Sequence, residues 1–263
     1  MKRAFGRTTS IFFVLLLLLR ISVPSVMADI KVYRSVPTGD KRIALTFDDG
    51  PHPTLTPRIL EILDRYGIKA TFFMVGENVI NYPETAREVI KRGHEVGNHT
   101  FTHPHIAGLN EDAIMEEIGK CEDALEELCE YRPHLLRTPQ GALTPSLEKC
   151  LQDDDYILVL WSLDTRDWEK KSTASVVRAV LDRVQAGDII LMHDFIGHNS
   201  KTPDALEKII PQLLSQGYEF VTVSALLGIW EGEREDAICY GACILTIVRD
   251  DNGRGTAFLQ IIV

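Results

Sequence analysis

The stretch IALTFDDG, residues 43–50, is a short β-prone run that ends in two aspartates and a glycine. Helical periodicity follows over residues 54–66, with Pro57 near its start and Gly67 just past its end. A second β-prone run covers residues 70–75. This order of strand, helix and strand is typical of a parallel sheet with crossover helices.

The same alternation continues along the chain. Further helices are predicted over 83–92, from the N-cap Asn110 to about Cys129, over 174–185, and from Thr202 (N-cap) and Pro203 (N1) to near Gly217. Further strands are predicted over 95–97, 134–137, 156–163, 188–193 and 218–223, followed by a turn capped by Ser224. The 156–163 run is apolar throughout, as in a strand that is buried on both faces. The number of units and their closeness favour a barrel over an open sheet.

Residues 231–263 depart from this alternation. A charged stretch at 231–236 precedes two β-prone runs, 238–248 and 256–263, and the turn signal DDNG lies between them at 250–253. We therefore expect a small C-terminal β-hairpin, to which the sequence assigns no role, appended to a main domain over residues 29–230.

The first 28 residues have the order of a secretory signal peptide. A basic stretch precedes an apolar run at 11–19, and small or apolar residues lead to Ala28. The alternative is a retained membrane anchor, but a bilayer requires roughly 20 apolar residues, about twice this run. We expect cleavage after Ala28 and a secreted or cell-wall-associated protein.

The charge of the chain restricts its partners. The formal net charge is −10, and removing the four basic residues of the signal segment takes it to −14. Nucleic acid is excluded because its recognition needs basic contacts to phosphate. Anionic membranes and polymers gain nothing from long-range attraction to such a chain. A neutral substrate such as an N-acetyl sugar fits better, and no protein partner is implied.

The five cysteines are Cys121, Cys129, Cys150, Cys239 and Cys243. Because the count is odd, at least one thiol is unpaired in an exported chain. The spacing lacks paired C-x-x-C units, which disfavours a structural zinc ribbon. Cys239 and Cys243 are candidates for a local disulfide, and the alternative is that most of the cysteines are small buried apolar residues.

Reactive residue types gather where the predicted strands end. The segments are TFDDG at 46–50, HTFTH at 99–103, RTPQG at 137–141, DTRDW at 164–168 and LMH at 191–193. Each segment alone is weak evidence for an active site. Paired aspartates before glycine usually form a solvated turn, and a lone H-x-x-x-H is more often structural. In a parallel barrel, however, all strand carboxyl ends open on one face. The five segments together therefore predict one active-site cleft.

In order and spacing, these five segments resemble the motifs of the polysaccharide deacetylase family, carbohydrate esterase family four, over about residues 41–228. The resemblance implies a distorted (β/α) barrel of about seven parallel strands with a divalent metal, usually zinc, in a surface groove. It also implies hydrolysis of N-acetyl groups on an N-acetylated polysaccharide, with peptidoglycan the foremost candidate.

The resemblance assigns the metal ligands and the acid–base pair. Asp49, His99 and His103 would hold the metal, and two imidazoles with one carboxylate are a common zinc set that cobalt and nickel also accept. Asp48 would be the general base and His193 the general acid. Because successive strand residues point to opposite sides, Asp48 and Asp49 are not expected to compete for the metal.

Supporting roles follow from the same resemblance. Arg137 would orient the general base and keep it ionised, and Asp167 would tune the general acid. The backbone N–H of Gln140 would stabilise the oxyanion, and Trp168 and Leu191 would line a pocket for the acetyl methyl group. The family commonly has an aromatic residue where Gln140 stands, so the groove shape and sugar preference are expected to differ.

Other polar residues receive lesser roles. Asp164 is equally consistent with a supporting hydrogen bond and with a strand-end cap, and Asp194 is a minor candidate for tuning the neighbouring histidine. His52 is expected to be solvated rather than to line the groove. The other histidines expected to be surface or structural residues are His94, His105, His134 and His198.

Two alternative functions stay open. The same site is suited to cleaving an O-acetyl ester on a xylan-like glycan. An inactive sugar-binding wall protein is the other alternative, but decayed sites usually lose a metal ligand or the base, and this chain keeps both kinds of residue.

Overall fold

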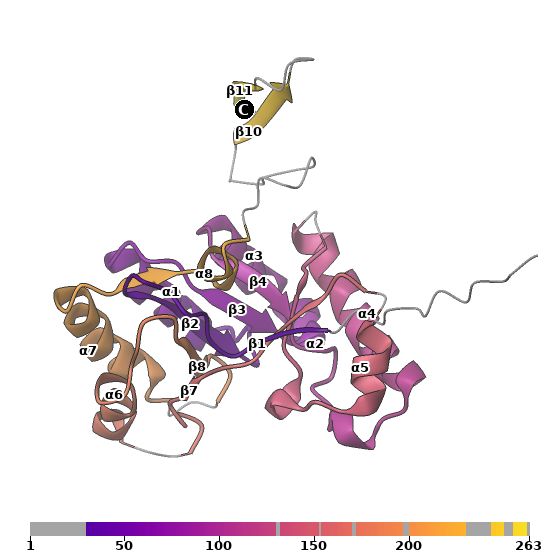
Figure 1. Ribbon diagram of the computed structural model, residues 1–263, viewed down its shortest axis with the longest axis horizontal. Helices are drawn as coiled ribbons and strands as arrows, with labels where there is room; N and C mark the ends of the chain where they lie inside the picture. Colours follow the sequence, from indigo (N-terminus) through magenta and orange to yellow (C-terminus); the bar gives the residue numbers. More distant parts are fainter. Residues whose placement is uncertain are drawn as a thin grey trace, which may run out of the picture.

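In a computed structural model, the chain forms a curved parallel sheet covered by helices (Figure 1). The structure describes residues 30–129, 132–152, 154–169, 172–196 and 200–229, together with the backbone of two strands, 243–249 and 255–261. The signal peptide predicted at residues 1–28 lies outside the described residues. Within the described part, no helix is long and apolar enough to cross a membrane.

The elements follow the alternation seen in the sequence. The strands are β1 (Lys31–Tyr33), β2 (Arg42–Asp48), β3 (Thr71–Met74), β4 (Glu95–Asn98), β5 (Leu135–Leu136), β6 (Ile157–Val159), β7 (Leu163–Asp164), β8 (Ile189–His193), β9 (Glu219–Val221), β10 (Cys243–Arg249) and β11 (Gly255–Ile261). The α-helices are α1 (Leu55–Arg65), α2 (Gly76–Asn81), α3 (Pro83–Lys91), α4 (Glu111–Cys129), α5 (Pro145–Leu151), α6 (Thr173–Leu181), α7 (Thr202–Ser215) and α8 (Val223–Leu227), and two 3₁₀ turns are η1 (Ile106–Gly108) and η2 (Pro139–Gly141).

The main sheet curls into an incompletely hydrogen-bonded barrel. Its strand order is β1-β6-β5-β4-β3-β2-β8-β7, with β9 paired to the start of β2, and every pairing is parallel. Only residues 160–162 connect β6, near one edge, to β7 at the other. Four Cα–Cα steps from Val159 to Leu163 span at most about 14 Å, so the two edges lie close together. The predicted distorted (β/α) barrel is confirmed.

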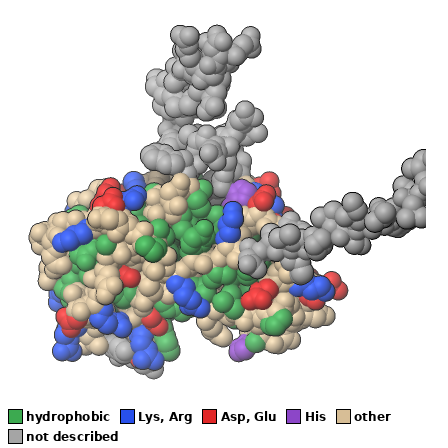
Figure 2. Space-filling model, in the orientation of Figure 1, with side chains coloured by type: hydrophobic (Ala, Val, Ile, Leu, Met, Phe, Trp, Pro, Cys, Tyr) green, Lys and Arg blue, Asp and Glu red, His purple; other side chains and the backbone are tan. Residues whose placement is uncertain are grey.

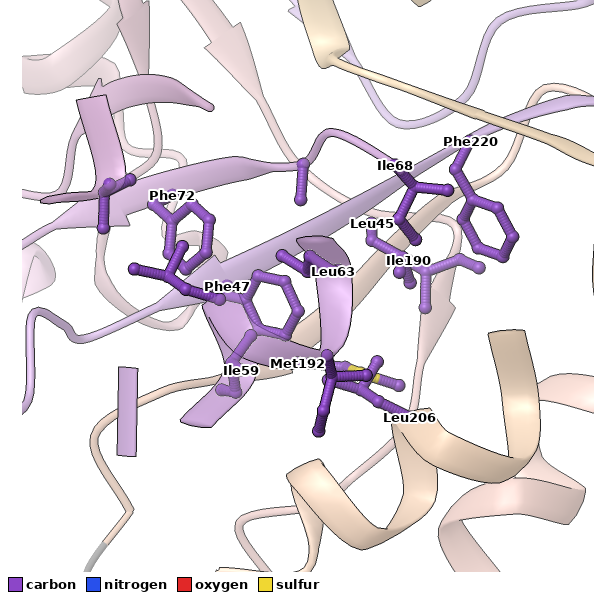
Figure 3. Close-up of a cluster of buried hydrophobic side chains, with 14 of the residues drawn as sticks. Leu45, Phe47, Ile59, Leu63, Ile68, Phe72, Ile190, Met192, Leu206 and Phe220 are labelled. Carbon is purple, nitrogen blue, oxygen red and sulfur yellow. The ribbon is translucent and has the colours of Figure 1, made fainter. Parts of the chain in front are cut away.

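Strand β2 separates two apolar layers. Its alternate residues Ile43, Leu45 and Phe47 pack into a cluster with α1 and α7, where Figure 3 shows Phe47 beside Ile59 and Met192. Ala44 belongs to a different cluster inside the barrel. Because residues two apart share a strand face, Thr46 and Asp48 also face the barrel interior. Burying a side chain such as Phe47 contributes about 1.5–3 kcal/mol, which fixes the register that carries Asp48 inward.

One predicted strand is wrong. The run 156–163 was expected to be a single strand, but β6 ends at Val159 and β7 begins at Leu163. The two pieces pair with different partners, since β6 lies between β1 and β5 whereas β7 pairs with β8. Apolar character throughout this run reflects burial in both places and does not reveal where the chain changes partners.

Two helix caps also differ from prediction. Lys201 rather than Thr202 is the N-cap of α7, and α8 is capped by the Thr222 hydroxyl, which accepts from Ala225 N, rather than by Ser224. Asn110 does cap α4, because its Oδ1 accepts from Ala113 N at 2.9 Å. The sequence missed β1, α2 and α5, which are too short to produce a clear periodicity.

The C-terminal hairpin is present as expected. Strands β10 and β11 pair antiparallel, with a register from Cys243 opposite Ile261 to Arg249 opposite Gly255. The predicted turn at 250–253 lies outside the described residues.

Candidate active site and metal centre

Three side chains from two loops converge at the carboxyl end of the sheet. Asp49 Oδ1 lies 3.3 Å from His99 Nε2 and 3.3 Å from His103 Nε2. One ligand atom from each residue lies within 4.8 Å of the other two. The Nδ1 of His99 bonds to the Arg137 carbonyl oxygen at 2.7 Å, which requires a proton on Nδ1 and directs Nε2 at Asp49. This donor set, with its supporting carbonyl, fits a divalent cation.

The backbone is unusual at these residues. Asp49 has φ 73°, His103 has φ 56° and Gln140 has φ 59°. Non-glycine residues in this left-handed region cost about 1–3 kcal/mol each and persist only where the surroundings hold them. Two expected metal ligands and the expected oxyanion donor therefore share a backbone feature that the sequence alone does not reveal.

The two neighbouring aspartates do not diverge as expected. Strand β2 ends at Asp48, and the left-handed turn at Asp49 brings both carboxylates toward His99, at 3.8 Å for Asp48 Oδ2 and 3.3 Å for Asp49 Oδ1. The alternation of side chains along a strand therefore does not separate them. What differs is that Asp48 also pairs with an arginine.

That arginine is Arg137, which lies inside the barrel with its side chain fully buried. Its Nη1 is 2.7 Å from Asp48 Oδ1, and its guanidinium lies 4.1 Å from the centre of the Phe73 ring. Its other N–H bonds go to Thr46 Oγ1 at 2.8 Å, Val159 O at 2.9 Å and Leu160 O at 3.0 Å. Because these contacts fix the guanidinium, the carboxylate of Asp48 has one defined orientation.

His193 and Asp167 form the second polar pair. His193 Nδ1 lies 2.8 Å from Asp167 Oδ1, while Asp167 Oδ2 accepts from His193 N at 2.9 Å and from Thr202 Oγ1 at 2.6 Å. Burial alone would lower the pKa of His193, but the Asp167 carboxylate outweighs burial and raises that pKa to about 9. The imidazole is thus protonated at neutral pH. The Thr202 hydroxyl is directed at Asp167 by this hydrogen bond, which explains why it does not cap α7.

The two pairs are adjacent. Asp48 and His193 are register partners on the neighbouring strands β2 and β8. Neighbouring strands lie about 4.8 Å apart, so the Asp48 carboxylate and the His193 imidazole extend from adjacent strands beside the Asp49, His99 and His103 cluster.

Helix α4 and helix α2 hold the loop that carries the two histidines. Glu117 Oε2 accepts from Phe101 N at 3.1 Å and Thr102 N at 2.8 Å, and its Oε1 accepts from Thr102 Oγ1 at 2.9 Å. On the other side, Gly76 N donates to Thr100 O at 3.0 Å. No local pattern singles out Glu117, because it is one of many acidic residues on the amphipathic helix α4.

The remaining predicted site residues lie in strands β7 and β8 or in the segments that follow strands β5 and β7. Leu191 is buried on β8 and Trp168 is 51% exposed. Gln140 is exposed in η2. Asp164 Oδ1 accepts from Arg166 N at 2.8 Å, so the strand-end cap is the interpretation that holds.

His52 is buried, and the expectation that it is solvated is wrong. Its Nδ1 accepts from Leu55 N at 3.0 Å and from Thr54 N at 3.1 Å, so the ring caps the start of α1. His94 is also buried, with Nδ1 accepting from Ala70 N at 3.2 Å, which matches the expected structural role.

Asp194 is a buried carboxyl group beneath the aspartate turn. Its Oδ2 accepts from Thr56 Oγ1 at 2.5 Å, and its N donates to Asp48 O at 3.1 Å. Burial raises the pKa of Asp194 to about 7. A Cβ on Gly50 would lie 2.2 Å from Asp194 Oδ2, which explains why glycine follows the two aspartates.

Among the described cysteines, Cys121 and Cys150 are free, and Cys121 is buried as a small apolar residue would be. The side chains of Cys129, Cys239 and Cys243, and the whole of His198, lie outside the described residues.

The sequence of this chain is similar to that of known proteins. Residues 35–159 match the sequence profile of a family described as polysaccharide deacetylase. A peptidoglycan-N-acetylglucosamine deacetylase from Bacillus cereus is 39% identical over 193 residues, which cover 73% of this chain and 70% of the relative. The chain belongs to the polysaccharide deacetylase family.

Solved structures of this family share the fold. The crystal structure of a peptidoglycan N-acetylglucosamine deacetylase is 38% identical, covers 75% of this chain and 92% of its own, and has a TM-score of 0.72. The Xyl-CE4 domain of a multidomain xylanase from the hindgut metagenome of Trinervitermes trinervoides is 37% identical, covers 72% of this chain and 90% of its own, and has a TM-score of 0.66. A pseudoenzyme of the family from Bacillus anthracis is 28% identical, covers 77% and 70%, and has a TM-score of 0.71. Because the fold also occurs in a pseudoenzyme, activity must be argued from the residues of this chain.

Proposed function

We propose that this polysaccharide deacetylase hydrolyses the N-acetyl groups of GlcNAc-type residues in cell-wall peptidoglycan. The observation that carries the proposal is the adjacency of a carboxylate, Asp48, and a protonated imidazole, His193, on neighbouring strands beside the Asp49, His99 and His103 cluster. Amide hydrolysis needs a base for water and an acid for the amine, and this arrangement offers both.

We propose one divalent cation, zinc before cobalt or nickel, held by Asp49, His99 and His103. When bound, such a cation polarises the acetyl carbonyl and lowers the pKa of a coordinated water toward neutrality. The support for this assignment is the donor set and the carbonyl that orients His99 Nε2.

Asp48 takes the proton of the attacking water in this proposal. Arg137 orients that carboxylate through Oδ1, so the other oxygen, Oδ2, is left to accept the proton. The water oxygen bonds to the acetyl carbon, and the carbonyl oxygen gains negative charge. The N–H of Gln140, on its left-handed turn, is the donor that stabilises this oxyanion.

His193 completes the reaction by giving its proton to the amide nitrogen, the C–N bond breaks, and acetate and a free amine leave. Asp167 supports this role because it holds the imidazole and raises its pKa. Trp168 and Leu191 are proposed to enclose the acetyl methyl group, the former from the surface and the latter from the buried strand.

We also propose export through the N-terminal segment, which places the enzyme where wall glycan is found. The support is the order of basic, apolar and small residues in the sequence.

O-acetyl ester hydrolysis is the second candidate, favoured by the likeness to the xylanase-linked esterase domain. An alcohol leaves more readily than an amine, so esters depend less on the acid. The discriminating experiment compares acetate release from peptidoglycan, chitooligosaccharides and acetylxylan for the wild type and His193→Ala. A deacetylase loses much more of its amide activity than of its ester activity in the variant. Zinc-loaded, folded protein that releases acetate from acetylxylan alone would contradict the proposed function.

A further inference from the structure

A polar pocket of about 370 Å³ lies between the segment that follows β7 and helix α6. Three arginines line it, Arg166 from the segment and Arg178 and Arg183 from α6 and its C-terminal end, together with Asp164 and Asp182. Figure 2 shows Lys and Arg side chains gathered over the region where Figure 1 places α6. Three guanidinium groups thus share one pocket with two carboxylates, in a chain with a net charge of −10.

The partners of the arginines set this pocket apart. Eleven arginines have described side chains, and eight of them lie within 4.0 Å of a carboxylate oxygen. Among those eleven, the three without a carboxylate partner are Arg34, Arg178 and Arg183. Two of these three line the same pocket. Neither guanidinium therefore has a direct ion pair among the described residues, although Asp164 and Asp182 line the same pocket.

Arg183 is held in place without being neutralised. Its Nε donates to Ala179 O at 2.9 Å and its Nη2 donates to Asp164 O at 3.1 Å. Backbone carbonyls orient the guanidinium and leave its net charge intact. Arg166 shares its charge with Glu169 at 2.6 Å, so Arg178 and Arg183 supply most of the available positive charge.

The pocket adjoins the proposed catalytic acid. Arg166 immediately precedes Asp167, whose Oδ1 lies 2.8 Å from His193 Nδ1. Consecutive Cα atoms are about 3.8 Å apart, so one segment has one residue in the pocket and the next in the active site. A group bound in the pocket can thus belong to the same glycan that presents its acetyl group to His193.

We propose that this pocket binds a carboxylate carried by the glycan substrate, and this inference rests on the proposed function above. Guanidinium groups match the two oxygens of a carboxylate with paired N–H donors. Peptidoglycan carries carboxylates on its peptide substituents, and on its lactyl groups where no peptide is attached, whereas chitooligosaccharides carry none. The pocket gives an acidic protein, which repels anionic polymers at long range, a local means of preferring an anionic glycan over a neutral one.

The test compares kcat/KM for acetate release from a peptide-bearing muropeptide oligomer and from chitotetraose. Replacing both Arg178 and Arg183 with Gln lowers the ratio of the two values about threefold to tenfold, mainly through KM for the muropeptide. Arg34→Gln, which changes the third arginine without a carboxylate partner but not the pocket, is the matched control. An unchanged ratio in the double variant, or an equal change in Arg34→Gln, overturns the inference. A glycan oligomer stripped of its peptides distinguishes the lactyl carboxylate from the peptide carboxylates.

A binding measurement separates this inference from the proposed function. In the Asp48→Asn background, calorimetry of muropeptide binding should show a threefold to tenfold weaker Kd for the double arginine variant. If the wild type releases no acetate from either glycan, the proposed function fails and the binding comparison still decides the pocket. If the Asp48→Asn protein binds the muropeptide with the same Kd with and without the two arginine substitutions, the carboxylate-binding role of the pocket is contradicted, whatever the activity.

Discussion

Arg137 Nη1 lies 2.7 Å from Asp48 Oδ1, and the two side chains form a buried ion pair inside the barrel. The next residue, Asp49, has no such arginine partner among the described residues and instead faces two histidines. This difference in partners supports the separate roles proposed for the two adjacent carboxylates. Four of the five guanidinium N–H groups donate to buried acceptors, which stabilises the charge in a place where an unpaired charge would be costly.

Asp48→Asn is expected to lower kcat about 10²–10⁴-fold, because the amide cannot accept the water proton. The amide keeps the volume of the carboxylate and one acceptor for Arg137, so metal binding persists. Acetate release and metal content are measured together, with exposed Asp123→Asn as the control. Loss of the metal along with activity would assign Asp48 to the metal site instead.

The rate of amide hydrolysis is expected to fall as pH rises through about 9. His193 has a raised pKa, so its protonated, proton-donating form exists below about 9 and disappears above it. In Asp167→Asn the carboxylate that raises this pKa is gone, and the alkaline limb of the kcat profile should move toward the ordinary histidine value of about 6.5. If kcat of Asp167→Asn falls at the same alkaline pH as kcat of the wild type, His193 is ruled out as the acid.

Glu117→Gln is expected to weaken metal binding about 10- to 100-fold, the usual cost of losing a group that supports a ligand. The charged acceptor for Phe101 N and Thr102 N is replaced by a neutral one, which loosens the loop between His99 and His103. Glu116→Gln is the matched control, because Glu116 is exposed and pairs only with Lys120 among the described residues. Equal metal Kd values for both variants would show that the loop does not need its anchor.

Gly50→Ala is expected to destabilise the fold by at least about 1–3 kcal/mol, as overpacking of a buried position does. The new Cβ would lie 2.2 Å from Asp194 Oδ2, whereas a Cβ on the control Gly108 meets nothing within 4 Å. Adding Asp194→Ala to Gly50→Ala should restore part of the lost stability, since it removes the clashing oxygen. Additive losses in thermal unfolding of the double variant would exclude this contact as the cause.

Much of the fold could be predicted because local patterns and burial agree. The stretch 43–50 alternates between two apolar layers, and its polar end lies where parallel strands open. The helices with long amphipathic stripes, such as α4, were predicted within one or two residues. The break between β6 and β7 was missed because both pieces are buried, and burial erases the periodic signal.

The site was predictable in its residue types but not in its local geometry. The spacing of motifs indicated that Asp49, His99 and His103 meet, and their ligand atoms do gather within 4.8 Å. The left-handed turn at Asp49 and the anchor at Glu117 depend on tertiary contacts that leave no local pattern. The burial of His52 was not predictable for the same reason. A histidine that caps a helix has the same sequence context as one in a solvated turn.

The central claim is that Asp49, His99 and His103 hold one divalent cation on which deacetylation depends. Elemental analysis of purified wild type, His99→Ala and His103→Ala, after incubation with zinc and gel filtration, tests it most directly. We expect about one zinc per wild-type chain and a large loss of zinc in each folded variant, with acetate release falling in parallel. Full zinc occupancy in both histidine variants would contradict it.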